Sequence, residues 1–193
     1  MAPLVNPGQT ITNAQVYQGL VIAGEGIKTA PAGILTVQGN LEKSGLSNFE
    51  ANGGTVLLNG SNQSFAGLTY YNLHLDNTGT KTLAGNATIL DSIWIGNSVS
   101  NPATLLETGN NYLTLKSTAS KTARLGTVAP AANIHYNGSG RFVVERNYTP
   151  RRAWRLVTAP ITADAGRSVF NSWQMGGTTT TGSGIFITGP QAP

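Results

Sequence analysis

Residues 68–79 have the sequence LTYYNLHLDNTG, the clearest alternating pattern in the chain. In an extended strand, Tyr71, Leu73 and Leu75 lie on one side of the backbone. The opposite side then carries Tyr70, Asn72, His74 and Asp76. The NTG that follows supplies residues that tolerate the positive φ of a tight turn. The stretch therefore predicts a half-buried strand that ends in a turn.

The composition favours an all-β protein. The chain has 193 residues, of which only 10% are charged, against about 25% in an ordinary domain. A chain so poor in Lys and Glu is no helical bundle, because those residues cover helix surfaces. The absence of cysteine excludes a disulfide scaffold, a cysteine-based zinc site and a thiol nucleophile. Two histidines are too few for a multi-histidine metal centre.

Short strand-like runs recur along the chain, among them GILTVQGN, GTVLLNG, ATILDSIWIGN and NYLTLKS. Turn asparagines follow one another at spacings of 19, 18, 20 and 14 residues, at Asn40, Asn59, Asn77, Asn97 and Asn111. A loose repeat of this length suits one coil of a right-handed β-solenoid-like stack of short strands. Stacked coils bury a narrow apolar column and leave Thr, Ser and Asn in water. A β-sandwich also has short strands with frequent turns, and it remains the alternative.

Charge divides the chain unevenly. Residues 1–120 hold four lysines against six acids, whereas residues 121–193 hold eight basic residues against two acids. We expect solenoid-like repeats over 1–120 and a β-rich, Arg- and Trp-containing closing region over 121–193. A helix is expected only at SVFNSWQM, residues 168–175. The basic region has no nucleic-acid-reading element, so no nucleic-acid partner is expected. No apolar run is long enough to span a membrane.

Two stretches carry a family resemblance. The first resembles NGS-x-Q repeats of large secreted bacterial surface proteins, through Asn59, Gly60, Ser61, Gln63, Phe65, Gly67, Tyr70, Asn72, Leu73, Leu75, Asp76 and Asn77. The second is similar to an R-A-W-R segment common in the same proteins, through Val144, Arg146, Tyr148, Pro150, Arg152, Ala153, Trp154, Arg155, Leu156, Val157, Thr158, Ala159 and Pro160. SVFNSWQM and GSGIFITG match pieces that follow in that family.

The resemblance implies a cell-surface or secreted chain exported by the type IX route, often with adhesive modules. The sequence carries neither the signal peptide nor the sorting domain of that class, so we expect an excised portion of a larger bacterial protein. The expected location is extracellular or on the cell surface. The expected partners are a glycan, a protein surface or copies of the chain itself.

Catalytic signals are sparse. None of the eight acids forms a recognisable glycosidase pair, and Asp76, Asp91 and Glu107 are expected on the coil surface. Asp76 and Asp91 lack the D-x-D spacing of a calcium cage, which polysaccharide lyases on β-solenoids use. Neither a G-x-S-x-G elbow nor a phosphate-binding loop occurs. The sequence predicts no enzyme, no cofactor and no metal site.

Arg152, Trp154 and Arg155 form the most distinctive local feature. Trp154 is either a sugar-stacking platform beside Arg152 and Arg155 or a core residue that their stems cover, and we favour the core interpretation. Asp91-Ser92-Ile93 resembles the O-glycosylation site of the same secreted class, which makes Ser92 a candidate modification site.

Two classes of function remain. The leading hypothesis is a non-enzymatic extracellular structural or adhesive module, with self-assembly into fibres as a variant, because solenoid ends expose strand edges. The alternative is a carbohydrate-binding or polysaccharide-degrading β-solenoid.

Overall fold

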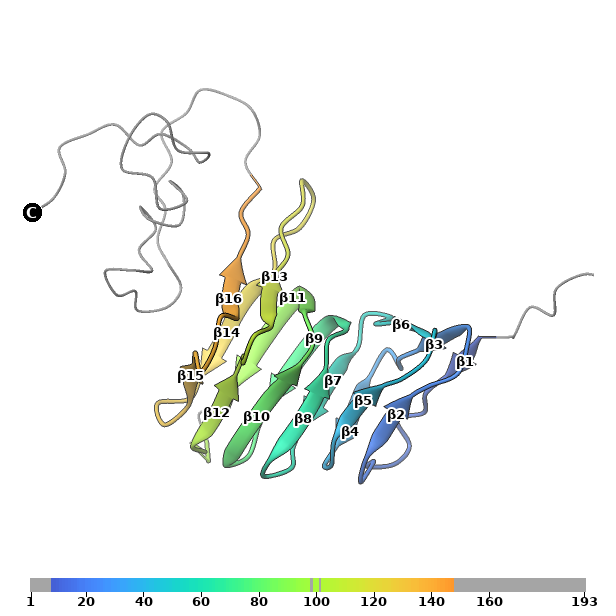
Figure 1. Ribbon diagram of the computed structural model, residues 1–193, viewed down its shortest axis with the longest axis horizontal. Coiled ribbons are helices and arrows are strands. Elements are labelled where there is room, and N and C mark those ends of the chain that lie inside the picture. Colours follow the sequence, from blue (N-terminus) through green and yellow to red (C-terminus); the bar gives the residue numbers. More distant parts are fainter. Residues whose placement is uncertain (1–7, 98, 101, 148–193) are drawn as a thin grey trace, which may run out of the picture. The chain divides into compact units, whose positions relative to one another are not determined.

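The computed structural model describes residues 8–97, 99–100 and 102–147. These residues form a β-solenoid in which strands from successive coils lie side by side (Figure 1). Every strand pairing among them is parallel, which confirms the solenoid prediction and excludes the β-sandwich alternative. The expected helix at 168–175 and residues 152, 154 and 155 lie outside the described residues.

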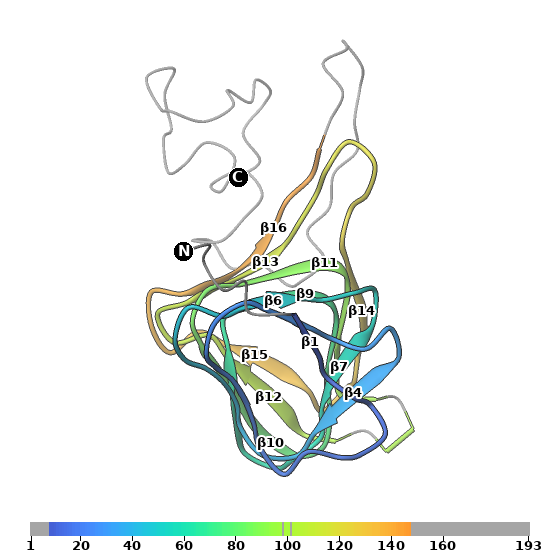
Figure 2. The same ribbon diagram turned by 90° about the vertical axis from the view of Figure 1, so that its right-hand side faces the viewer.

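Three faces surround the interior when the coils are viewed along the stack (Figure 2). The first face holds β2 (Leu20–Ile22), β5 (Leu41–Lys43), β8 (Gln63–Ala66), β10 (Gly79–Ala84), β12 (Thr104–Glu107) and β15 (Asn133–His135). A three-stranded sheet holds β1 (Gln9–Thr10), β3 (Ile27–Thr29) and β6 (Asn48–Glu50). The remaining sheet holds β4 (Ile34–Val37), β7 (Thr55–Leu58), β9 (Thr69–Leu75), β11 (Ala87–Ile95), β13 (Tyr112–Leu115) and β16 (Arg141–Val144), and β14 (Arg124–Val128) pairs with β11.

The long strands β9 and β11 each serve two faces. Their first halves pair at Thr69 and Thr88, and the first half of β11 continues the pairing to β13. Their second halves pair from Asn72 and Ser92 onward, and these extend to β7 on one side and β14 on the other. The register shifts between the two halves, because each strand bends there from one face to the next.

This bend corrects one detail of the sequence analysis. Leu73 and Leu75 point inward as predicted and are fully buried, but so is Tyr70, whereas Tyr71 is only partly buried. The strict alternation holds only within the second half of β9. The bend changes which side of the strand faces inward, so Tyr70 packs in the core near the rings of Phe49 and Phe65.

Aliphatic residues in register make up the core. One column along the second face pairs Leu35 with Val56, Val56 with Leu73 and Leu73 with Ile93. None of the four is more than 3% exposed. Burial of one such column per face supplies the hydrophobic stabilisation that the short strands lack individually.

The coils lengthen along the chain. In-register partners on the first face are 18 residues apart from Gln63 to Lys81, and 28 residues apart from Leu106 to Ile134. We expected the solenoid repeats to end at residue 120, but parallel stacking continues through β14, β15 and β16. The longer coils contain an added hairpin at 117–122, so a drifting sequence period does not mark the end of the stack.

Turn asparagines lie where the sequence spacing suggests for part of the stack. Asn59, Asn77 and Asn97 follow the second-face strands of three successive coils, and Asn77 adopts a φ of 67°. The side-chain amide of Asn77 donates to the carbonyl oxygen of Asn59 in the coil before it. Asn40 and Asn111 precede β5 and β13, and therefore lie at other corners.

Candidate functional site

Of the predicted site residues, only Ser92 lies in the described part of the chain. Ser92 is 0% exposed, and its hydroxyl oxygen accepts a hydrogen bond of 3.0 Å from Nε of Arg124 in the next coil. The neighbouring coils therefore cover this hydroxyl in the folded chain. Modification of Ser92 stays a prediction, and it requires either local opening or modification before the chain folds.

The outer side of the second face carries the most varied cluster of side chains in the described residues. We call it the Trp94 face and define it by residues of four adjacent strands: Leu57, Asn72, His74, Ser92, Trp94 and Arg124. Inward aliphatic residues flank its central positions on both sides, as Ile93 and Ile95 flank Trp94. Since successive side chains of a strand alternate, the residue between two inward ones must point outward.

Trp94 is held between its neighbours in the adjacent coils. Its ring centroid lies 6.0 Å from that of His74, with the two planes inclined at 58°. On the other side, a Cβ at position 126 would come within 2.4 Å of Nε1 of Trp94, so only glycine leaves room for the indole there. The indole is half-buried, and within the described residues its N–H donates no hydrogen bond. Part of a large aromatic surface is thus presented outward.

His74 and Arg124 place polar groups on either side of this ring. Nε2 of His74 lies 3.2 Å from the carbonyl oxygen of Gly96, and because a carbonyl only accepts, Nε2 carries the proton in this contact. This arrangement leaves Nδ1 as an acceptor on the neutral ring. The exposed guanidinium of Arg124 uses Nε for Ser92, and its terminal N–H groups bond to no described residue.

A second cluster lies at the corner beside the Trp94 face. Nζ of Lys121 lies 3.2 Å from Asp91, donates to the hydroxyl of Tyr71 at 2.6 Å and sits 4.1 Å from the centroid of the Tyr71 ring. The hydrogen bond to Tyr71, followed by the interactions with Asp91, raises the pKa of Lys121. These contacts fasten the hairpin at 117–122 to β9 and β11, so their role is to hold the hairpin.

The acidic side chains of the later coils bond to the next coil along the stack. Asp76 accepts two hydrogen bonds from the amide of Asn97, at 2.8 and 3.0 Å. Glu107 pairs with His135 at 3.0 Å. Asp91 pairs with Lys121, and in the same manner Glu145 pairs with Lys116 at 3.1 Å. Within the described ranges, no three His, Asp or Glu residues gather as a cation site would need.

Two polar side chains point into the interior of the first face. Oε1 of Gln63 accepts from the backbone N–H of Gly60 at 2.6 Å, and its amide donates to the carbonyl of Val37 at 3.0 Å. Lys81, its register partner in the next coil, donates to the carbonyls of Gly60 and Ser61. Burial lowers the pKa of Lys81 to about 8, although nearby Asp76 opposes the shift. Both side chains satisfy turn carbonyls that would otherwise be unpaired.

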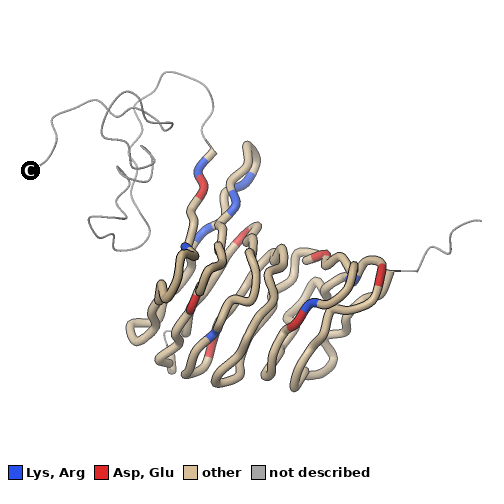
Figure 3. The backbone as a smooth tube through the Cα atoms, in the orientation of Figure 1, with Lys and Arg blue, Asp and Glu red and all other residues tan. Residues whose placement is uncertain are grey.

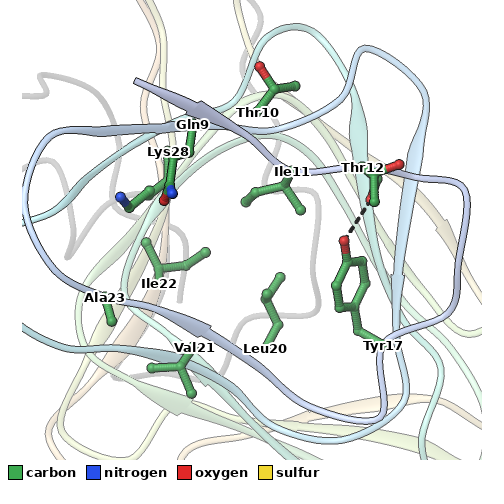
Figure 4. A pocket seen from close by; sticks show the side chains of 10 residues that line it. All are labelled: Gln9, Thr10, Ile11, Thr12, Tyr17, Leu20, Val21, Ile22, Ala23 and Lys28. Atoms are coloured by element: carbon green, nitrogen blue, oxygen red, sulfur yellow. Dashed lines mark hydrogen bonds between the residues drawn. The ribbon is translucent and has the colours of Figure 1, made fainter. Parts of the chain in front are cut away.

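A hollow opens at the N-terminal end of the described coils (Figure 4). The side chains of Ile11, Leu20 and Ile22 point into it, and the hydroxyl of Tyr17 donates to the carbonyl of Thr12 across its rim. These three aliphatic residues belong to the same interior that continues through the stack. The hollow is therefore the open end of the core column and carries no cluster of reactive groups.

Charge within the described residues follows the sequence asymmetry. Basic residues gather around the hairpin after β13 and near β14 and β16 (Figure 3). Arg141 covers the ring of Tyr136 at 5.7 Å, and Arg146 donates to a backbone carbonyl. The basic side chains here are dispersed over several faces.

Sequence reasoning missed Trp94 as a site residue. The signal was present in Ile93-Trp94-Ile95, where alternation places a large aromatic on the outer face between two core residues. An outward aromatic is more informative than an inward one, since the core does not require it.

Comparison of the chain with known protein families, curated proteins and solved structures finds no match. In the part of the chain that the structure describes, no helix has the length and apolar character needed to cross a membrane.

Proposed function

We propose that this chain is an extracellular structural and adhesive module of a larger bacterial surface protein and that it acts without catalysis. One observation carries the proposal: Asp76, Asp91, Glu107 and Glu145 each bond to a side chain of the adjacent coil. A hydrolase or lyase needs carboxylates or bases that converge on a substrate. Here the same groups link one coil to the next.

Two further features support this role. Asparagine side chains add bonds between coils, since Oδ1 of Asn40, Asn62 and Asn86 each accepts from a backbone N–H of the next coil. Such bonds suit a rigid spacer with flat outer faces. The extracellular bacterial context is supported by the sequence resemblance in residues 59–77 and 144–160.

A product assay tests the absence of catalysis. The purified chain is incubated with cellulose, chitin, xylan, alginate and pectin, and new reducing ends and unsaturated uronate products are measured. We expect no product above a heat-denatured sample of the same chain. Product formation that is lost with heat denaturation would contradict the proposal and favour the polysaccharide-degrading alternative.

Self-assembly into fibres is a variant of the same proposal. The edge strands β1 and β2 flank the open end of the core column, and Val21 on β2 is 55% exposed. Edges of this kind pair readily with another chain. We expect concentration-dependent filaments in electron micrographs and fewer filaments for Val21→Lys, because a charged side chain blocks edge pairing. A monomer at every concentration would contradict this variant.

A further inference from the structure

The Trp94 face combines an outward aromatic ring with hydrogen-bonding groups on a rigid support. Trp94, His74 and Arg124 project from three strands whose neighbours fix them in register. The other large exposed apolar side chains of the described residues, such as Ile27, Leu46 and Val99, lie outside this face. The face is thus a small aromatic site with polar neighbours and lacks a broad apolar surface.

We propose that the Trp94 face binds a glycan chain, with one pyranose ring stacked on the exposed part of the Trp94 indole. This inference rests on the proposed adhesive, non-catalytic role and names the ligand class. Sugar C–H bonds are attracted to the negatively charged face of an aromatic ring, while sugar hydroxyls need donors and acceptors close by. The terminal N–H groups of Arg124 and Nδ1 of His74 supply both kinds of partner.

The chemistry of the face favours a glycan over a protein partner. A stable protein interface buries about 800 Å² on each side and has a desolvated apolar centre. Around Trp94 the neighbouring outward positions carry Asn72, His74, Ser92 and Arg124, which are all polar. Sites for small polar ligands pair one or two aromatic rings with a few placed hydrogen-bonding groups.

The support is organised before any ligand arrives. The ring of His74 flanks the indole on one side, and on the other the absence of a Cβ at Gly126 accommodates it. Arg124 is anchored through Nε to the buried hydroxyl of Ser92. Side chains that are already ordered lose less conformational freedom on binding, so a modest contact area gives measurable affinity.

The test is affinity electrophoresis in native gels cast with soluble xylan, alginate, pectin or hydroxyethylcellulose, together with pull-down on insoluble chitin. We expect the full chain to be retained by at least one of these glycans. Trp94→Ala should weaken that retention at least tenfold, and Trp94→Phe should keep part of it. Gly126→Ala should also weaken it, because the new methyl group displaces the indole.

Tyr112→Ala is the matched control. Tyr112 is an exposed aromatic on β13, outside the Trp94 face, and its loss should leave retention unchanged. Each variant is used only if its melting curve shows a folded chain, and Trp94→Phe and Gly126→Ala keep the test open if Trp94→Ala does not fold. Absence of retention by all five glycans, or equal retention of the chain and its Trp94 variants, overturns the inference. Either result leaves the non-catalytic scaffold standing, since only product formation contradicts that.

Discussion

The indole of Trp94 fills the space above Gly126, where a Cβ would lie 2.4 Å from Nε1 and 2.5 Å from Cδ1. The two residues belong to adjacent coils, so the fit of one large side chain depends on a missing side chain in the next coil. This contact couples the geometry of the Trp94 face to the stacking of β14 on β11.

Gly126→Ala should therefore destabilise the chain by about 1–3 kcal/mol, because the methyl group forces the indole out of its place. The free energy of unfolding is measured by urea denaturation. In a Trp94→Ala background the same glycine substitution should cost much less, since the clash is gone. Equal costs in the two backgrounds would show that Gly126 does not contact Trp94.

Leu73→Asp should unfold the coils or nearly so. Leu73 is 0% exposed within an aliphatic column, and an unpaired charge there has no partner. Thr69→Asp on the same strand is the control, because Thr69 is exposed and a surface change costs less than about 0.5 kcal/mol. Thermal melting followed by far-UV circular dichroism compares them, and similar melting temperatures would refute the assignment of Leu73 to the interior.

Gln63→Leu should cost about 1–3 kcal/mol, although it adds an apolar residue to the interior. The substitution leaves the N–H of Gly60 and the carbonyl of Val37 without their partner. Ser64→Ala on the outer side of the same strand should have little effect on the urea midpoint. If Gln63→Leu were neutral or stabilising, the turn bonds of Gln63 would not matter for stability.

Lys81 predicts an unusual alkaline dependence of stability. Its pKa is lowered from 10.5 to about 8, so between these values the unfolded chain binds more protons than the folded one. The free energy of unfolding should therefore rise from pH 8 toward pH 10, by up to about 3 kcal/mol. At lower pH both states hold the proton, and the cost of burying the charge is present in full.

Urea denaturation of the chain and of Lys81→Met across pH 7.0–9.5 isolates this effect. The upper limit avoids the ionisation of tyrosine, because burial raises the pKa of Tyr70 and stability falls again once unfolded tyrosine ionises. The difference in unfolding free energy between the two chains should change steadily with pH above 8. A constant difference would mean that Lys81 titrates normally.

Much of the fold was predictable from local sequence. The alternation around Leu73 and Leu75 and the turn asparagines identify short strands and a coil of about twenty residues. Sequence alone did not reveal the bend of β9, because Tyr70 and Tyr71 are equally able to face inward and only the change of face decides between them. The later coils drift in length, which concealed that β14–β16 continue the stack.

The candidate site was less accessible to sequence reasoning. Its residues come from three coils and are 18 to 22 positions apart in the chain, from His74 to Trp94 and from Asn72 to Trp94. Only the parallel register brings them together. Lys81 is likewise indistinguishable from a surface lysine in the sequence, and its burial follows from the inward position it shares with Gln63.

The central claim is that the outer face at Trp94 is a binding surface on a non-catalytic scaffold. An NMR titration tests it most directly, with cello-, xylo-, chito- and guluronate hexasaccharides added to the ¹⁵N-labelled chain. Indole N–H signals are assigned from Trp94→Phe, Trp154→Phe and Trp173→Phe variants. We expect the Trp94 signal to shift in a saturable manner with at least one hexasaccharide, which remains intact throughout. An unshifted Trp94 signal with every hexasaccharide, or cleavage of any of them, would contradict the account.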